Sequence, residues 1–594
     1  MTDSASNHGP PSAEFYKAFQ DNYQAVGKVM QDFAAGHGNL SFDPMSLNRV
    51  WVEWLGAMAK EPEKVIEASM RFWQDAMTLY QQSALQFLGG GPAQPVIAEA
   101  PGDRRFRHEH WVAQPAFAAI KQSYLLASKW LRDVVADVEG LDEKTARKVE
   151  FFTERLIDAM SPTNFAATNP AVLERVKATD GANLAQGLRN LLRDLDAGDG
   201  RLRIRMTDAA AFELGKNVAV TPGQVIYQNR LFQLIQYAPA ADTVFKRPLL
   251  IVPPWINKFY ILDLQPENSL LRWLVEQGHT VFVISWVNPD GSYRDTGFDD
   301  YVKTGLLAAI DAVGAATGEA DLNVIGYCIG GTLLAITLAY MRAKGDTRIQ
   351  SATFLTTLLD FSEPGDLGVF TDEASIAALE QQMASEGFLE GAAMAGTFNL
   401  MRANDLIWSF YINNYLLGND SRPFDLLYWN ADSTRMPLAM HSWYLRKLYL
   451  NNALVAGHVE IDGVAIDLSR IDIPACFVST VDDHIAPWRS TYAGARKLGG
   501  SVKFILGGSG HIAGIVNPPQ ANKYGYRTTA KLPDDCQAWA DEAPIKAGSW
   551  WSEWQRWIRR KAGKPTSARI PGDGALAVIE PAPGSYVRVR SDAR

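Results

Sequence analysis

The sequence predicts an α/β fold with a mostly parallel sheet, preceded by an all-α domain. Short apolar runs, such as 248–253, 280–286 and 322–325, alternate with helical patterns after about residue 200. These runs are continuously apolar, which is typical of strands covered on both faces. The first 200 residues instead place apolar residues at helical spacing. We therefore expect two domains, a helical one at 1–200 and an α/β one at 201–594.

Two apolar stripes mark the start of the all-α region. The first falls within 15–33, and the second consists of Ile66, Met70, Trp73, Met77 and Tyr80. Such a stripe usually faces the core of its own domain, and the alternative is docking onto a partner or an apolar surface. A hinge rich in Gly and Pro at 89–103 separates these helices from a further helical stretch.

Composition and charge restrict the class of protein. The chain has 57 basic and 66 acidic residues, a balance that gives no general attraction to nucleic acid or to an anionic membrane. Cys328, Cys476 and Cys536 are far apart, so we expect neither a disulfide framework nor a zinc cluster and infer a reducing, cytoplasmic compartment. No run has the length of a membrane span, and we expect no transmembrane segment, metal or organic cofactor.

The residues around Cys328 have the order of a nucleophile elbow. An apolar run at 322–325 is followed by G-Y-C-I-G-G at 326–331 and then by a helical pattern. Small residues two positions before and after a nucleophile allow a tight turn from strand to helix, and the helix N-terminus stabilises negative charge nearby. Cys328 is therefore a candidate nucleophile, and the alternative at this point is a buried structural cysteine in a Gly-rich turn.

An acid and a histidine follow in the chain order of an α/β-hydrolase site. The predicted strand 475–480 leads to Asp483, and the next predicted strand leads to a Gly-rich loop that contains His511. In a parallel sheet such loops meet at the carboxyl ends of the strands. His511 would take the thiol proton of Cys328, while Asp483 would orient the imidazole or act on the incoming substrate.

The sequence leaves alternatives to both residues. Asp482 is adjacent to Asp483 and has the same chemistry, and His484 lies on the acid loop itself. We interpret His441, which lies upstream of both loops, as structural.

Two further parts of a catalytic site are indicated. The backbone N–H groups of Ile329, directly after the nucleophile, and of Trp255, after the predicted strand 248–253, are placed to bind an oxyanion. An insertion rich in Met, Trp and Tyr interrupts the α/β pattern at about 362–472. At this position in the fold it would form a lid over the site.

Four separated motifs resemble the polyhydroxyalkanoate synthases. They are P-P-W-I-N-K-F-Y-I-L-D-L at 253–264, the elbow at 326–331, D-H-I-A-P-W at 483–488 and G-H-I-A-G at 510–514. The stretch F-D-L-L-Y-W-N in the predicted lid is similar to the family too. The length and the helical N-terminal region resemble class I, the single-subunit type that prefers short-chain monomers. Some relatives carry cysteine at the position of Trp255, but only its backbone N–H is assigned a role.

The resemblance implies an acyltransferase that polymerises (R)-3-hydroxyacyl-CoA, with 3-hydroxybutyryl-CoA as the expected monomer, into polyester with release of CoA. By this similarity Cys328 is acylated, His511 is the base, and Asp483 assists deprotonation of the attacking 3-hydroxyl. The family also suggests a homodimer, a lid that opens on activation, and a place at the surface of cytoplasmic polyester granules with phasin-like partners.

Two other functions compete with this interpretation. A thioesterase or intracellular depolymerase would use the same three residues with water as the acceptor. The large helical region and the Trp-rich insertion argue against it. A granule-coating protein without activity would not need Cys328, Asp483 and His511 in the correct order.

Overall fold

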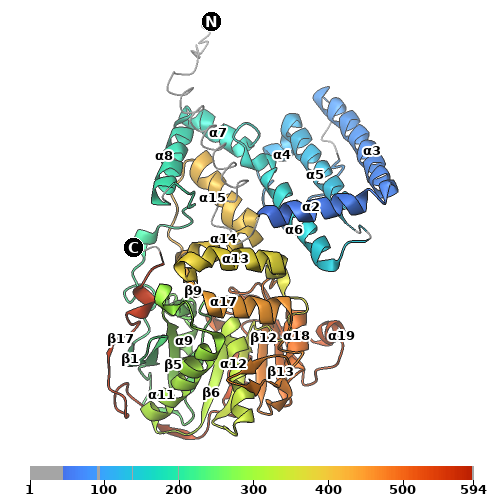
Figure 1. The fold of residues 1–594 in the computed structure, drawn as a ribbon. Coiled ribbons are helices and arrows are strands. Elements are labelled where there is room, and N and C mark those ends of the chain that lie inside the picture. Colours follow the sequence, from blue (N-terminus) through green and yellow to red (C-terminus); the bar gives the residue numbers. More distant parts are fainter. Residues whose placement is uncertain (1–43, 90–93, 137, 139, 199, 592–594) are drawn as a thin grey trace. The chain divides into compact units, whose positions relative to one another are not determined.

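Figure 1 shows the computed structural model of the chain. It describes residues 44–89, 94–136, 138, 140–198 and 200–591, so the stripe predicted within 15–33 lies outside the described residues. The described residues up to Asp208 form one compact unit together with Gly396–Arg422, and the rest of the chain forms a second. The middle of the predicted lid therefore belongs to the helical unit, whereas the sequence placed all of 362–472 in the catalytic domain.

The first unit is helical. Its helices from the N-terminal part of the chain are α2 (Pro44–Met58), α3 (Pro62–Phe87), α4 (His110–Ala113), α5 (Pro115–Val135), α6 (Glu143–Ala159), α7 (Pro170–Thr179) and α8 (Ala182–Ala197). Side-chain caps define two of the starts, because Asp142 accepts hydrogen bonds from two backbone N–H groups of α6, and Asn169 does so for α7. The unit also contains the π-helical turns η8 (Asn404–Trp408) and η9 (Ile412–Leu416), with α15 (Ser409–Tyr411) between them.

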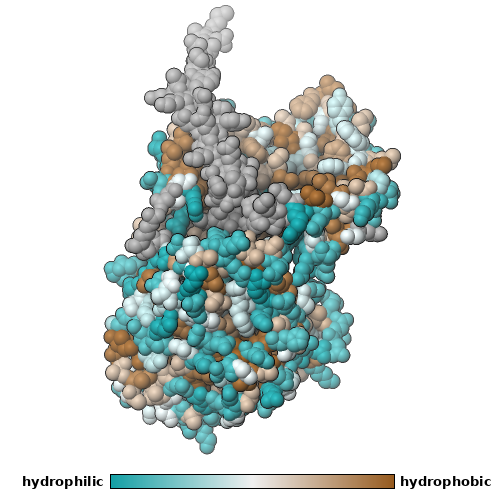
Figure 2. All heavy atoms as spheres, viewed as in Figure 1, coloured by the Kyte–Doolittle hydropathy of each residue, from teal (hydrophilic) through white to brown (hydrophobic). Residues whose placement is uncertain are grey.

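Helix α3 packs on α5 with one side and exposes the other. Phe72 lies on the packed side, where its ring contacts Trp130. The stripe that the sequence singled out is exposed, from 54% for Ile66 to 71% for Tyr80. Figure 2 shows hydrophobic residues on the surface over this helix. Of the two orientations that the sequence allowed, the structure adopts the one in which the stripe is open for docking.

The second unit is built on one mixed sheet of eleven strands with the order β15-β14-β13-β12-β7-β6-β4-β5-β2-β1-β17. The parallel strands are β4 (Leu249–Val252), β5 (Val281–Trp286), β6 (Leu322–Tyr327), β7 (Ile349–Leu355), β12 (Ala475–Thr480) and β13 (Val502–Gly507). The antiparallel edges are β14 (Tyr526–Arg527), β15 (Ile545–Lys546), β1 (Gly223–Gln228), β2 (Phe232–Tyr237) and β17 (Glu580–Pro581). The predicted α/β fold is confirmed.

Helices accompany this sheet. They are α9 (Leu270–Glu276), α10 (Phe298–Asp300), α11 (Ala308–Thr317), α12 (Ile329–Ala343), α18 (Trp488–Ala495), α19 (Cys536–Glu542) and α20 (Trp551–Ile558). Helix α12, which follows the elbow, is buried from Ile329 through Met341. Short strand pairs complete the unit, namely β3 (Thr243–Phe245) with β16 (Pro565–Ser567) and β10 (Glu460–Ile461) with β11 (Val464–Ala465).

The flanks of the lid insertion stay with the second unit. They contain α13 (Glu373–Glu386), β8 (Phe388–Leu389), the start of α14 (Gly391–Met401), α16 (Asp425–Ala431), β9 (Met436–Pro437), α17 (Leu438–Tyr444) and the π-helical turn η10 (Leu445–Leu450). The two short strands pair with each other and so join the flanks. Among the helices of the described residues, none has the length and apolarity that crossing a membrane requires.

Candidate active site

Cys328 lies on a strained turn between β6 and α12. Its backbone has φ 53° and ψ −125°, a conformation that residues other than glycine rarely adopt. The turn is held by a hydrogen bond of 2.9 Å from the Cys328 N–H to the carbonyl of Leu355 on β7. Strain of this kind at the end of a strand is what a nucleophile elbow requires, because it presents the side chain above the sheet.

The elbow glycines are needed for close backbone contact. A Cβ on Gly326 would lie 2.4 Å from the Cα of Gly331, and one on Gly330 would lie 2.2 Å from the carbonyl oxygen of Val252. A Cβ on Gly331 would come within 2.0 Å of the Thr357 hydroxyl oxygen. The G-x-C-x-G-G spacing thus lets α12 start directly against the ends of β4 and β7.

His511 and Asp483 form a buried pair. His511 Nδ1 lies 2.7 Å from Asp483 Oδ2, and Asp483 Oδ1 accepts hydrogen bonds from the N–H groups of Ile485 and Ala486 at 2.9 and 2.8 Å. Asp482 is exposed. The structure therefore places Asp483, and not its neighbour, beside the histidine.

The loop that carries His511 is braced by the tryptophans of the closing helix. The indole N–H groups of Trp550 and Trp551 each donate at 2.9 Å, to the carbonyls of Gly514 and Ile515. Both rings are buried, as expected for a helix that packs on the catalytic domain. Because these carbonyls follow His511 closely, the helix fixes the position of the imidazole.

His511 interacts electrostatically with Cys328 as well as with Asp483. Burial lowers the pKa of His511, but the charges of Asp483 and Cys328 and side-chain hydrogen bonds to both outweigh this effect and raise the pKa to about 10. The structure therefore brings the three predicted residues together. A protonated His511 stabilises negative charge on the sulfur of Cys328.

Trp255 lies in a well-supported loop after β4. The Trp286 indole N–H donates to the carbonyl of Pro253 at 2.8 Å, and the Thr434 hydroxyl lies 2.6 Å from the carbonyl oxygens of both Trp255 and Ile256. Since Gly330 touches the end of β4, this loop begins beside the elbow, where Ile329 is the first residue of α12. A rigid backbone is what preorganised oxyanion donors need.

A buried ion pair, which the sequence analysis did not predict, also stabilises the Trp255 loop. Lys258 Nζ lies 2.7 Å from Asp432 Oδ1, with both side chains at most 3% exposed. Asp432 also accepts a hydrogen bond from the Tyr260 hydroxyl at 2.9 Å, and Lys258 donates to the carbonyl of Val587 at 2.7 Å. The pair ties the Trp255 loop to the lid flank and to the C-terminal segment. Lys258 lies within the 253–264 motif that resembles the family, and this could have marked it as a functional residue. Nothing in the sequence indicated that it pairs with Asp432.

The lid flank also places two tyrosines near the nucleophile. Tyr444 and Tyr449 are buried with ring centroids 5.1 Å apart. Burial raises the pKa of both phenols, and the charge of Cys328 raises both further. His441 is buried on the same flank, where burial lowers its pKa to about 3 and keeps it neutral.

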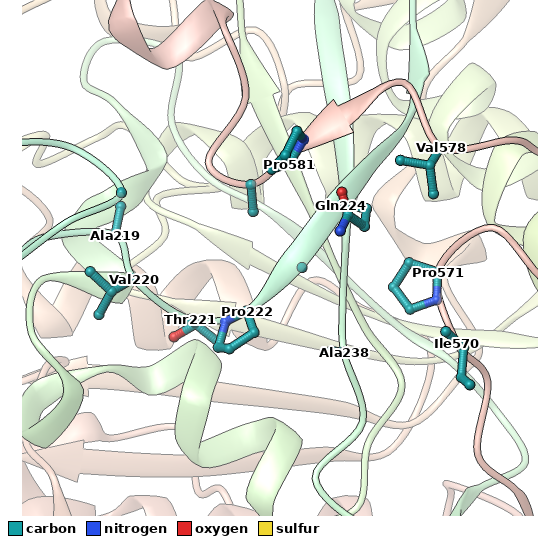
Figure 3. A pocket seen from close by; sticks show the side chains of 13 residues that line it. Ala219, Val220, Thr221, Pro222, Gln224, Ala238, Ile570, Pro571, Val578 and Pro581 are labelled. Atoms are coloured by element: carbon teal, nitrogen blue, oxygen red, sulfur yellow. The ribbon is translucent and has the colours of Figure 1, made fainter.

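A pocket of about 460 Å³ lies elsewhere in the second unit. Figure 3 shows Thr221, Pro222 and Gln224 on one side of it, and Pro571 and Val578 on the other. Its described lining includes none of the three predicted catalytic residues, so we assign it no part in the chemistry.

The parallel sheet, the elbow after β6 and the loops after β12 and β13 define an α/β-hydrolase fold. The family model described as "alpha/beta hydrolase fold" matches residues 247–518. The model described as "Poly-beta-hydroxybutyrate polymerase (PhaC) N-terminus" matches residues 102–274.

Curated relatives then identify the family. A poly(3-hydroxyalkanoate) polymerase of Methylorubrum extorquens is 51% identical over 92% of this chain and 90% of its own. The polymerase subunits of Rhizobium meliloti and Cupriavidus necator are 47% and 42% identical, over 92% and 89% of this chain and 88% and 89% of their own. The chain belongs to the family of poly(3-hydroxyalkanoate) polymerases.

The His511–Asp483 pair makes stability depend on pH. The pKa of His511 is raised from 6.5 to about 10 on folding, so its contribution is fully present below the unfolded value and is lost as the pH rises through about 10. Asp483→Asn removes the charge that raises this pKa. We expect the loss of unfolding free energy between about pH 7 and pH 10 to be smaller in this variant, as measured by urea unfolding.

Asp482→Asn is the matched control, because this exposed neighbour carries the same charge without contacting His511. It should keep the pH dependence of the wild type. An Asp483→Asn variant with an unchanged pH dependence would contradict the pairing.

Proposed function

We propose that this chain polymerises (R)-3-hydroxyacyl-CoA, with 3-hydroxybutyryl-CoA as its expected monomer, into polyhydroxyalkanoate through an acyl thioester on Cys328. The observation that carries the proposal is a cysteine on a strained elbow, electrostatically joined to a buried His511–Asp483 pair. Family membership supports the reaction class, since relatives at 42–51% identity are named poly(3-hydroxyalkanoate) polymerases.

In the first half-reaction the Cys328 sulfur attacks the thioester carbonyl of the monomer. His511, whose raised pKa of about 10 keeps it protonated at neutral pH, holds the thiol proton and delivers it to the departing CoA sulfur. One carbon–sulfur bond forms as another breaks, so the exchange is nearly balanced in energy. The backbone N–H groups of Ile329 and Trp255 bind the tetrahedral oxyanion between these events.

In the second half-reaction a 3-hydroxyl attacks the acyl group on Cys328. The neutral His511 left by the first step accepts the hydroxyl proton, an ester bond forms, and the Cys328 thiolate is released. Both carboxylate oxygens of Asp483 are already engaged, one by His511 and one by two backbone N–H groups. We therefore assign Asp483 to positioning and charging the imidazole, through which it assists deprotonation of the hydroxyl.

The test is incubation of the full chain with (R)-3-hydroxybutyryl-CoA, with thiol release followed while chloroform-soluble polymer is recovered. We expect both products. Thiol release with only free hydroxy acid would assign water as the acceptor and favour a hydrolase. Absence of thiol release would contradict the proposed substrate.

Cysteine variants identify the nucleophile in the same assay. Cys328→Ala should lower turnover by about a thousandfold or more, because it removes the covalent intermediate. Cys476 is fully buried in β12 and Cys536 starts α19, so alanine at either position should leave turnover largely intact. Loss of activity from one of these two but not from Cys328→Ala would refute the assignment.

We also propose that the chain acts as a homodimer at the surface of polyester granules, with phasin-like proteins as neighbours. The exposed stripe of α3 supports an apolar contact, and we assign it to the polyester product. Glu63, Glu67 and Asp75 on this helix balance Lys64 and Arg71, so α3 offers no basic face to an anionic lipid surface.

Trp73→Glu tests this contact. Burying one large apolar side chain contributes about 1.5–3 kcal/mol, so binding to poly(3-hydroxybutyrate) particles in a sedimentation assay should weaken by about tenfold or more. Leu192→Glu is the control, since Leu192 is 53% exposed on α8 and lies outside the stripe. Unchanged binding of Trp73→Glu would contradict the polyester contact, and loss of the dimer in light scattering would assign the stripe to a second copy.

A further inference from the structure

The loop after β4 carries a buried backbone donor without a partner. Trp255 is 2% exposed, and within the part of the chain that the structure describes its N–H donates no hydrogen bond. Buried N–H groups are almost always paired, so an unpaired one needs an explanation. The loop begins beside the elbow, because a Cβ on Gly330 would lie 2.8 Å from the carbonyl oxygen of Pro253. The Trp255 N–H is therefore free to bind a group that forms at Cys328.

A short segment of the second unit holds this loop from its other side. Segment 432–434 runs antiparallel to 255–258, and the two are bridged at Asn257. The Thr434 hydroxyl lies 2.6 Å from the carbonyl oxygens of Trp255 and of the residue after it. These contacts fix the backbone directly after the free N–H.

The far end of the same stretch is fixed by the ion pair of Lys258 and Asp432. The two side chains are 3% and 1% exposed, with Nζ 2.7 Å from Oδ1. Each charge has a further partner, since the Tyr260 hydroxyl donates to Asp432 and Lys258 donates to the carbonyl of Val587. Apolar residues can often replace a buried ion pair without loss of stability. Stability alone therefore does not explain this pair, whereas a defined position of the loop backbone does.

The side chain of Trp255 is held as well. Its ring centroid lies 4.8 Å from that of Tyr301 and 5.9 Å from that of Phe298, and all three rings are buried. With the ring fixed on one side and the carbonyl on the other, the N–H between them keeps one orientation.

We propose that Lys258, Asp432 and Thr434 are positioning residues, which we call the loop clamp, that aim the Trp255 N–H at the oxyanion formed on acylation of Cys328. The inference rests on the proposed function only in taking Cys328 to be the residue that is acylated. The loop clamp acts through the backbone of 255–258 and not on the acyl group itself. A donor that is already in place costs no reorganisation when the oxyanion forms.

The test compares two reactions of Cys328 in the full chain. Acylation by S-phenyl thioacetate forms a carbon–sulfur bond through a tetrahedral oxyanion and expels thiophenolate. Alkylation by iodoacetamide expels iodide and forms no oxyanion. Both rates are followed on the Cys328 peptide by mass spectrometry. Their ratio measures stabilisation of the oxyanion independently of how reactive and accessible the thiolate is.

Two variants remove parts of the loop clamp. Thr434→Val keeps the shape of the side chain and removes its hydroxyl, and the double variant Lys258→Met/Asp432→Leu removes both charges without leaving one unpaired. We expect each to lower the ratio of acylation to alkylation by about tenfold or more, because a misplaced donor stabilises the oxyanion poorly. Thr434→Ser, which restores a hydroxyl, should recover most of the ratio.

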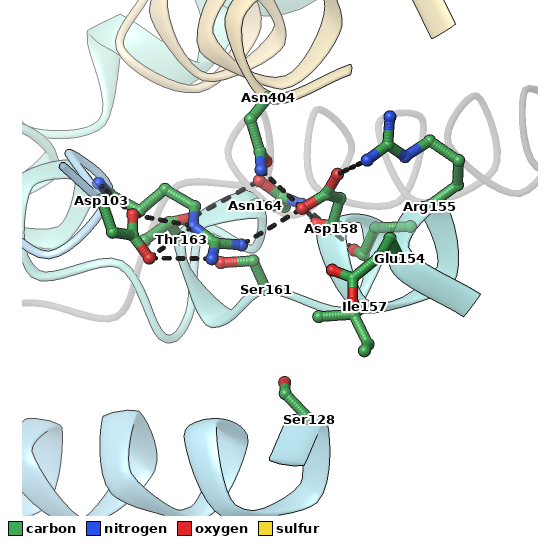
Figure 4. Close-up of polar contacts among 12 residues, drawn as sticks. Asp103, Ser128, Glu154, Arg155, Ile157, Asp158, Ser161, Thr163, Asn164 and Asn404 are labelled. Atoms are coloured by element: carbon green, nitrogen blue, oxygen red, sulfur yellow. Dashed lines mark hydrogen bonds and ion pairs between the residues drawn. The ribbon is translucent and has the colours of Figure 1, made fainter. Parts of the chain in front are cut away.

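Arg155→Met is the control. Arg155 Nη1 donates to the carbonyls of Leu400 and Met401 at 2.9 Å each, and its Nη2 lies 3.3 Å from Asp158 Oδ2. Figure 4 shows this contact, with Asn404 pointing toward the same carboxylate from another segment. The variant removes a cation from a largely buried pair, but all of these residues belong to the helical unit. It should keep the wild-type ratio.

A wild-type ratio in Thr434→Val and in the double variant would overturn the proposal. An equal fall in Arg155→Met would also overturn it, since any lost buried contact would then have the same effect. A double variant that matches the wild type in urea unfolding but keeps the low ratio would separate positioning from stability and support the proposal. If one clamp variant loses its circular dichroism, the other decides.

Neither probe is the proposed monomer. If the wild type releases no thiol from (R)-3-hydroxybutyryl-CoA, the proposed substrate fails while the result for the loop clamp stands. If the wild type makes polymer and the clamp variants keep the wild-type ratio, the loop clamp fails while the proposed function stands.

Discussion

The strained backbone of Cys328 is the constraint on which the arrangement of the second unit depends. Its φ of 53° is maintained by a hydrogen bond to β7 and by glycines that let α12 start against β4. One turn therefore connects the centre of the sheet, the buried helix behind it and the loop that presents Trp255. Local strain of this size persists only where the surroundings over-determine it, and here three elements do so.

A buried pair of charged side chains, Asp483 and His511, lies beside that turn. Asp483 is held by two backbone N–H groups and in turn holds His511, while Trp550 and Trp551 fix the histidine loop from behind. The balance between burial and these charges leaves His511 protonated at neutral pH. The same arrangement can serve acyl transfer to an alcohol or to water, so these three residues alone do not determine the acceptor. The helical unit, which includes the middle of the predicted lid insertion, is the part of this chain that an α/β-hydrolase domain alone would lack.

Local signals explain what the sequence could predict. Continuous apolarity identified the parallel strands, and glycine spacing identified the elbow, because each depends on neighbouring residues only. The sequence favoured Asp483 but left Asp482 as an alternative, since adjacent residues of one loop differ only in the direction of their side chains. Helix α3 carries apolar residues on two sides, and no pattern says which side meets α5. The contacts of Arg155 with Leu400 and Met401 join distant residues through backbone carbonyls, which leave no trace in a sequence.

The central claim is that Cys328 carries the acyl group during turnover. Mixing the full chain with (R)-3-hydroxybutyryl-CoA, quenching with acid within one turnover, and mapping peptic peptides by mass spectrometry tests it directly. The account predicts a hydroxybutyryl adduct on the peptide that contains Cys328 and no adduct in Cys328→Ala. Polymer formed with the acyl group on another residue, or with no adduct on the Cys328 peptide at any time before product appears, would contradict it.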